Sequence, residues 1–302
     1  MSNTDKGFMK RIVQGACLAA TLTAAPAVMA QTADDHYRAG AERIEIGDRV
    51  RMYSQRITAM ACMAEAGINA AENQAAIMEA IAEVDGLLDA MKDGDTALNV
   101  ALAEDDRRML SAIRGVALQW DTFKQAMTLR FDVGATEVGP DYISRQNLNL
   151  MHASKNLISE TISHYAIPPA LLQNDAFTLQ IATRQRTLSQ QIAKETCGIV
   201  TGNAVMGSEV RLAKSTRRFD ASLNALVNGF EGAGVSAPAT PEIRDGLAAM
   251  TADWSALRDQ LNSIDGTTGL DTVSEVYDDL DALLAQFDTI VPLYIAESKS
   301  GL

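Results

Sequence analysis

The sequence contains two copies of one segment, and this internal repeat constrains the fold more than any other feature. The segment at 44–57 aligns with the segment at 179–192, which places Arg51 on Arg186, an offset of 135 residues (186 − 51 = 135). Chance does not explain how far the same offset continues along the chain, so we predict two repeats, 31–167 and 168–302. The further matches are Cys62 with Cys197, Asp85 with Asp220, Leu88 with Leu223, Ala90 with Ala225, Gly94 with Gly229 and, after a slip of one, Trp120 with Trp254.

Each repeat has the pattern of four helices. Apolar residues recur every three to four positions, and the strict alternation that is typical of strands is missing. Aromatic residues make up only 5% of the chain, which also favours helix over strand. Short links between long helices make neighbouring helices antiparallel. We therefore predict an all-α fold of two tandem antiparallel four-helix bundles that form an intrachain pseudo-dimer, joined at Pro168-Pro169; one long helical solenoid is the alternative. The expected helices are 34–66, 73–92, 102–132 and 141–166 in the first repeat, and 170–202, 205–229, 240–263 and 270–298 in the second.

The first thirty residues have the pattern of a signal peptide. Lys10 and Arg11 precede an apolar run at 12–25, and small residues at 28–30 suit a signal peptidase. We predict a signal peptide at 1–30, cleavage after Ala30 and a periplasmic mature protein. The apolar run is shorter than the ~20 residues of a spanning helix, so an uncleaved anchor is the alternative. We expect no direct membrane insertion after cleavage.

Charge and motifs exclude several classes of function. The formal net charge of −13 repels nucleic acid, so no nucleic-acid partner is expected. The sequence has no glycine-rich phosphate loop, nucleophile elbow or paired catalytic constellation, and we predict a non-enzymatic protein without a cofactor. His36, His152 and His164 do not recur between the repeats and lack metal-ligand spacing. We expect all three histidines to be exposed, and we predict no metal site.

The helix at the repeated segment has two distinct faces. One stripe, which includes Ile46, Val50 and Ile57, is apolar and belongs to the bundle core. A second face, about 140° away, carries small residues around Arg51 in the first copy and around Arg186 in the second. A long arginine in the middle of a small-residue face needs a partner. Arg49, Arg184 and Arg56 point elsewhere, and we expect them to be rim or salt-bridge residues.

The segments at 49–56 and 184–191 resemble the first-helix signature of the PilJ/NarX-type sensor domain. This family includes the periplasmic parts of nitrate/nitrite sensor kinases and of the type IV pilus chemoreceptor. In the nitrate sensors, one first-helix arginine from each subunit of a dimer holds a single nitrate on the two-fold axis. The resemblance implies this role for Arg51 and Arg186. It also implies further ligand contacts from Ser54, Gln55, Ser189 and Gln190.

A pair of arginines suits a planar oxyanion. Each guanidinium offers a flat fork of donors that fits acceptors lying in one plane. Two guanidiniums about 6 Å apart repel each other by roughly 3 kcal/mol at an effective dielectric near 20, and a bridging anion reverses that sign. An anion would therefore draw the two halves of the chain together.

Three functions remain open. The first is a non-catalytic sensor subunit that binds nitrate or nitrite between its repeats. Since members of the family continue into a transmembrane helix whereas this sequence ends at Leu302, such a subunit would report to a membrane sensor kinase, chemoreceptor or transporter. The alternative is a protein-interaction module, related to the type IV pilus or its chemoreceptor, with no small-molecule ligand. The third is a structural helical protein with a vestigial arginine site.

Cys62 and Cys197 are the two cysteines that remain after the expected cleavage. They occupy equivalent positions on the arginine-bearing face, so a parallel pairing of the two repeated helices would place them at the same height. We predict a disulfide between them, since the expected compartment is oxidising. Two buried, unpaired thiols are the alternative.

Overall fold

The fold is all-α across the part of the chain that the computed structural model describes, residues 36–203 and 207–300. The expected signal peptide at 1–30 lies outside these residues. None of the described helices combines the length and apolarity needed to cross a bilayer. The helices of the first repeat are α2 (Gly40–Glu65), α3 (Ala70–Asp93), α4 (Arg107–Phe131) and α5 (Pro140–Tyr165), and those of the second are α6 (Gln173–Val200), α7 (Ser208–Asn228), α8 (Pro241–Leu261) and α9 (Leu270–Lys299).

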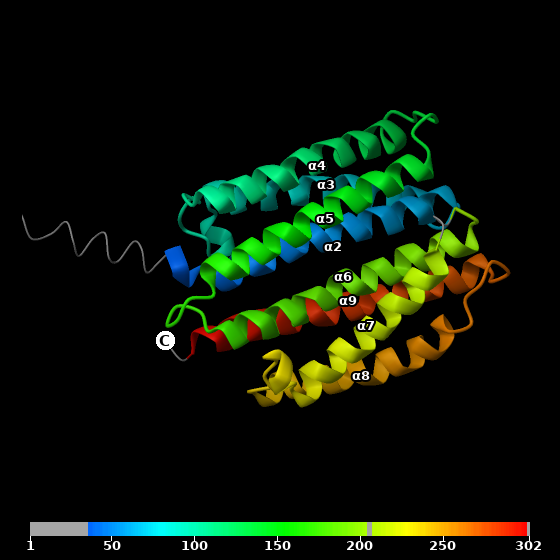
Figure 1. The fold of residues 1–302 in the computed structure, drawn as a ribbon. Helices are drawn as coiled ribbons and strands as arrows, with labels where there is room; N and C mark the ends of the chain where they lie inside the picture. The colour runs from blue at the N-terminus through cyan, green and yellow to red at the C-terminus, as the bar shows by residue number, and fades with distance from the viewer. Residues whose placement is uncertain (1–35, 204–206, 301–302) are drawn as a thin grey trace, which may run out of the picture.

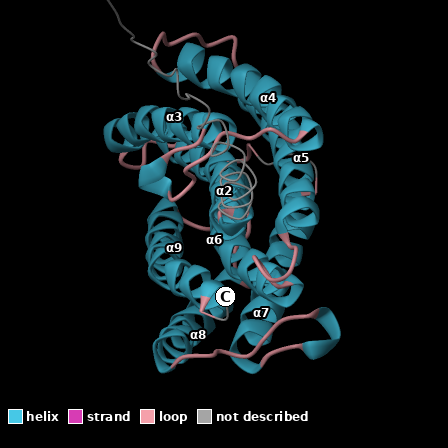
Figure 2. Cartoon of the chain, turned by 90° about the vertical axis from the view of Figure 1, so that its left-hand side faces the viewer, coloured by secondary structure: helices cyan, strands magenta, loops and turns pink. Residues whose placement is uncertain are grey.

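The predicted all-α fold of two repeats is confirmed. Helices α2 to α5 form one four-helix unit and α6 to α9 form the other, with α2 and α6 side by side where the units meet (Figure 1 and Figure 2). Consecutive helices run antiparallel, so α2 and α6 run in the same direction. Helices α4 and α8 lie on the outer sides of the molecule (Figure 2). The two repeated segments therefore lie at the centre of the structure, one in α2 and one in α6.

The glycines that match between the repeats end equivalent helices. Gly94 after α3 and Gly229 after α7 have φ angles of 82° and 75°, a region that favours glycine over residues with a side chain. Each is followed by a short 3-10 turn, Thr96–Leu98 in one repeat and Glu231–Ala233 in the other. The two repeats thus share the backbone conformation of these loops as well as their helices.

The matched tryptophans tie two helices together in each unit. Trp120 of α4 donates Nε1–H to Oδ1 of Asp85 of α3 at 2.8 Å. Trp254 of α8 donates in the same way to Asp220 of α7 at 3.2 Å. Both indoles are almost fully buried, where an unbonded N–H would be costly. This requirement explains why tryptophan and aspartate recur together.

Candidate functional site

The interface between α2 and α6 is closed by a covalent bond near the C-terminal ends of the two helices. Cys62 and Cys197 form a disulfide with their Cα atoms 6.2 Å apart. Met63 and Val273 pack beside it in a small apolar cluster. The two repeated helices are therefore held side by side at this end.

Arg186 lies at the same interface and is already satisfied by carboxylates. Its side chain is buried, with Nη1 donating to Oδ1 of Asp288 at 2.8 Å and Nη2 donating to Oε1 of Glu45 at 3.0 Å. Burial opposes its positive charge, but these two carboxylates outweigh that effect and raise the pKa of Arg186. Arg186 thus joins α6 to both α9 and α2.

Arg51, its equivalent in the first repeat, faces a different carboxylate. Nη1 of Arg51 lies 3.5 Å from Oδ1 of Asp48, and the buried Nε of Arg51 has no hydrogen-bond partner. Asp48 is 1% exposed, and neither of its oxygens accepts a hydrogen bond. The resemblance assigned Arg51 and Arg186 to one anion, whereas in the structure Arg51 lies nearest Asp48 and Arg186 donates to Asp288 and Glu45. The charge of Asp48 also contributes to the raised pKa of Arg186.

The four neighbouring polar residues that the resemblance indicated bond to protein groups. The hydroxyls of Ser54 and Ser189 donate to the backbone carbonyls of Arg51 and Arg186, at 2.7 and 2.9 Å. Oε1 of Gln55 accepts from Nζ of Lys194 at 2.7 Å. Nε2 of Gln190 lies 3.5 Å from Oδ1 of Asp281. All four side chains are fully buried, so they shape the interface from within.

Arg184 differs most from its counterpart in the first repeat. Arg49 forms an ion pair with Glu83 of α3, as expected of a salt-bridge residue. The position equivalent to Glu83 holds Arg218 of α7 (218 − 83 = 135). Burial lowers the pKa of Arg184, and the charges of Arg51 and Arg218 lower it further. The buried Nε of Arg184 has no hydrogen-bond partner.

Arg56 also forms a salt bridge, as expected, and this one crosses between the repeats. Its guanidinium pairs with the carboxylate of Asp281 on α9. Its equivalent is Gln191 (191 − 56 = 135), so the second repeat makes no matching ion pair from that position. Charged contacts between the units are therefore not symmetric.

A small pocket near the disulfide contains a second feature absent from the first repeat. The cavity measures about 60 Å³ and is lined by residues of both repeats, among them Asn147 and Lys194. Lys194 Nζ donates to Oδ1 of Asn147 at 3.0 Å and lies 3.5 Å from Glu195, while burial lowers the pKa of Lys194. The positions equivalent to Lys194 and Glu195 hold Ala59 and Met60. Because the first repeat has no charged residues at these positions, the residues common to the two repeats did not indicate this charged pair.

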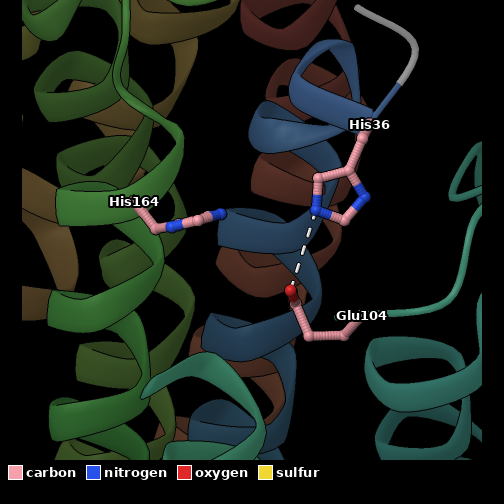
Figure 3. A group of neighbouring side chains, drawn as sticks. All are labelled: His36, Glu104 and His164. Atoms are coloured by element: carbon pink, nitrogen blue, oxygen red, sulfur yellow. Dashed lines mark ion pairs between the residues drawn. The ribbon is translucent and has the colours of Figure 1, made fainter. Parts of the chain in front are cut away.

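Two of the three histidines depart from the expectation of exposure. His36 and His164 are partly buried, and only His152 is exposed. His36 and His164 converge with Glu104, and one ligand atom from each of the three lies within 4.8 Å of the others (Figure 3). No sequence pattern indicated this cluster, because its members come from three separate segments.

The fold and the interface define a class, that of tandem helical bundles whose first helices pair across a charged, buried contact. The family model for the type IV pili methyl-accepting chemotaxis transducer N-terminal region, PilJ, matches residues 36–140 and 170–289. The chain therefore belongs to the PilJ family, with one segment of the match in each repeat. Searches of curated proteins and of solved structures gave no significant match. The family description, that of a chemotaxis transducer, agrees with the predicted sensory class.

Proposed function

We propose that this protein is a periplasmic, non-catalytic sensor subunit that binds a small oxyanion, nitrate or nitrite, beside the α2–α6 interface. It reports the bound state to a membrane-associated partner. Membership of the PilJ family supports a sensory role in general. The Cys62–Cys197 disulfide supports export, because such bonds persist in oxidising compartments and are rare in the cytosol.

The observation that carries the proposal is the excess of positive charge around Arg184. Arg51 and Arg218 lie close enough for their charges to lower its pKa. Asp48 is the carboxylate that opposes this effect. Arg184 thus has two other guanidiniums and one carboxylate as the charges that shift its pKa, a local surplus of positive charge in a protein whose net charge is −13. A bound anion would relieve that repulsion.

Arg51 and Arg184 are better placed for an anion than Arg51 and Arg186. Arg186 already donates to Glu45 and Asp288, so an anion would have to displace two carboxylates from a buried guanidinium. Breaking such pairs is costly because it leaves uncompensated charge behind. The Nε atoms of Arg51, Arg184 and Arg186 are all without hydrogen-bond partners, so the difference lies in the terminal nitrogens, which only in Arg186 donate to two carboxylates. An anion at Arg51 and Arg184 would therefore not have to displace such a pair of carboxylates.

This arrangement links binding to the relation between the repeats. Arg51 belongs to α2 and Arg184 to α6, so one anion between them connects the two units. The disulfide holds the helices together near their C-terminal ends. A change in charge balance then acts on the part of the interface away from the disulfide, where α2 and α6 have no direct covalent bond between them.

Calorimetric titration of nitrate and nitrite, with chloride as a comparison anion, tests the proposal. Arg51→Ala and Arg184→Ala should each lower the affinity at least tenfold, because hydrogen bonds to charged groups contribute about 1.5–3 kcal/mol each. Arg49→Ala is the matched control, since Arg49 is the equivalent of Arg184 and pairs with Glu83. It should bind like the unmodified protein, and thermal melting checks that each variant folds.

The proposal fails if the unmodified protein binds neither nitrate nor nitrite, or if Arg184→Ala binds them with unchanged affinity. The protein-interaction module without a small-molecule ligand would then take its place. In that case the arginines around Asp48 are structural. A pull-down from periplasmic extract, with the same variants, would then identify the partner.

A further inference from the structure

We propose that His36, Glu104 and His164 bind a divalent transition-metal ion, with Zn²⁺ the best match to their chemistry. His36 precedes α2, Glu104 lies in the link before α4, and His164 is in the last turn of α5. The three side chains point toward one another from these separate segments (Figure 3). One ligand atom from each lies within 4.8 Å of the others. This site is distinct from the arginines of the α2–α6 interface.

The ligand set is one that zinc uses. Two imidazole nitrogens and one carboxylate oxygen form an open site in which water or a substrate takes the fourth position. Nε2 of His36 lies 3.7 Å from Oε1 of Glu104, whereas ligand atoms around tetrahedral zinc lie roughly 3.3 Å apart. Small rotations of the two imidazoles would close the remaining gap.

Glu104 is already oriented for such a role. Its Oε2 accepts a hydrogen bond from the hydroxyl of Tyr165 at 2.6 Å and lies 3.3 Å from Nη1 of Arg43. Its Oε1 accepts from the backbone amides of Asp105 and Asp106 and faces His36. Metal-binding carboxylates are commonly fixed by hydrogen bonds from a surrounding shell of this kind. Both oxygens of the carboxylate are therefore fixed in position, with Oε1 turned toward the histidines.

A metal ion would share Oε1 of Glu104 with two backbone amides and would compete with one contact of His36. Nε2 of His36 lies 2.9 Å from the hydroxyl of Tyr165, so His36 must give up that contact to bind an ion through Nε2. Tyr165 can keep its hydrogen bond to Glu104. The exposed carboxylate of Asp105, 3.9 Å from Nε2 of His36, is positioned to attract a cation from solvent. It is also a candidate for the fourth ligand position.

The second repeat builds the same bundle without these residues. All three histidines of the sequence lie in the first repeat, and Leu171 stands at the position equivalent to His36. An equivalent four-helix unit therefore forms without a His–His–Glu cluster. This difference favours a binding role over a purely structural one.

Calorimetric titration of Zn²⁺ into untagged, chelator-treated protein tests the site. We expect one ion per chain and a rise in melting temperature with Zn²⁺, because an ion that binds only the folded state stabilises it. Bound Co²⁺ should give the visible absorption of nitrogen and oxygen ligation. His36→Ala and His164→Ala should each weaken binding at least tenfold, and the double variant should abolish both the heat and the melting shift.

His152→Ala is the matched control, because His152 is an exposed histidine on the same helix as His164. It should bind Zn²⁺ like the unmodified protein. Zn²⁺ binding that survives in the double variant, or no binding of Zn²⁺ or Co²⁺ by the unmodified protein, would overturn the proposal. The cluster would then be a hydrogen-bonded His–Tyr–Glu group only. The double variant leaves Glu104 and its contact with Arg43 in place, so loss of folding is not the expected cause of a negative result.

Discussion

Glu83 and Arg218 occupy equivalent positions in α3 and α7 and carry opposite charges, so Arg184 lacks the carboxylate that pairs with Arg49. Arg218→Glu should restore this pairing and raise the free energy of unfolding by about 0.5–1 kcal/mol, a typical value for a partly exposed ion pair. The gain should shrink at high salt, because exposed charges are screened. Urea unfolding at low and high ionic strength measures both effects.

The reciprocal change provides the control. Glu83→Arg would place two guanidiniums together in the first repeat and should lower stability by a similar amount. The interpretation of the interface is wrong if Arg218→Glu lowers stability at low salt. On the proposed function, Arg218→Glu should also weaken anion binding, since the new carboxylate would neutralise Arg184.

The disulfide should make a large contribution to stability. Its closure of the chain between Cys62 and Cys197 would stabilise the fold by about 5 kcal/mol on the chain-entropy model. Cys62→Ser, Cys197→Ser and the double variant should therefore unfold at clearly lower urea concentration, and to a similar extent. A free-thiol assay on denatured, unreduced protein should detect no thiol in the part of the chain after residue 30; two titratable thiols would contradict the bond.

The sequence was sufficient to predict the helices and the side-by-side packing of α2 and α6. Helical periodicity and the constant offset depend on local pattern and on residues that both repeats share, such as Cys62 and Cys197. The partners of the arginines were not predictable in this way. Asp288 reaches Arg186 from a helix far along the chain, and only the packing of α6 against α9 brings them together.

The strongest candidates for function lie where the repeats differ. A comparison of copies shows what both must keep for folding, such as the Trp120–Asp85 hydrogen bond and its counterpart. Arg218 and His36 are matched by residues of a different type in the other repeat, Glu83 and Leu171. A comparison of the two repeats therefore could not identify them. The sequence indicated no metal site, partly because the histidines do not recur between the repeats. That criterion set aside His36 and His164, which the structure brings together with Glu104.

Two helix glycines should respond in opposite directions to alanine. A Cβ atom added at Gly40 would lie 2.8 Å from Cβ of Tyr165, whereas nothing lies within 4 Å of one added at Gly115 in α4. Gly115→Ala should raise stability by about 0.5–1 kcal/mol through helix propensity. Gly40→Ala should lower it, because neither backbone can move away easily. Thermal melting of the two variants checks the prediction, and a stabilised Gly40→Ala would show that the contact between α2 and α5 is looser than described.

Acid should destabilise the protein through Glu104 when no metal is bound. Burial opposes ionisation of this side chain, but hydrogen bonds from His36, Tyr165 and the backbone of Asp106, with the charge of Arg43, lower its pKa from 4.5 to about 2. A depressed carboxyl pKa contributes stability that is complete above the ordinary value and is lost as the pH falls from 4.5 toward 2. For this buried group the loss is about 3 kcal/mol.

Urea unfolding between about pH 6 and about pH 3, with a chelator present, measures the greater part of this loss. Glu104→Gln should be less stable than the unmodified protein at the higher pH and should lose less stability on acidification, since the amide that replaces the carboxyl group does not titrate. Tyr165→Phe removes one of the hydrogen bonds that hold the carboxylate and should move the acid transition to higher pH. Parallel stability curves for the unmodified protein and Glu104→Gln would show that another carboxyl group controls acid unfolding.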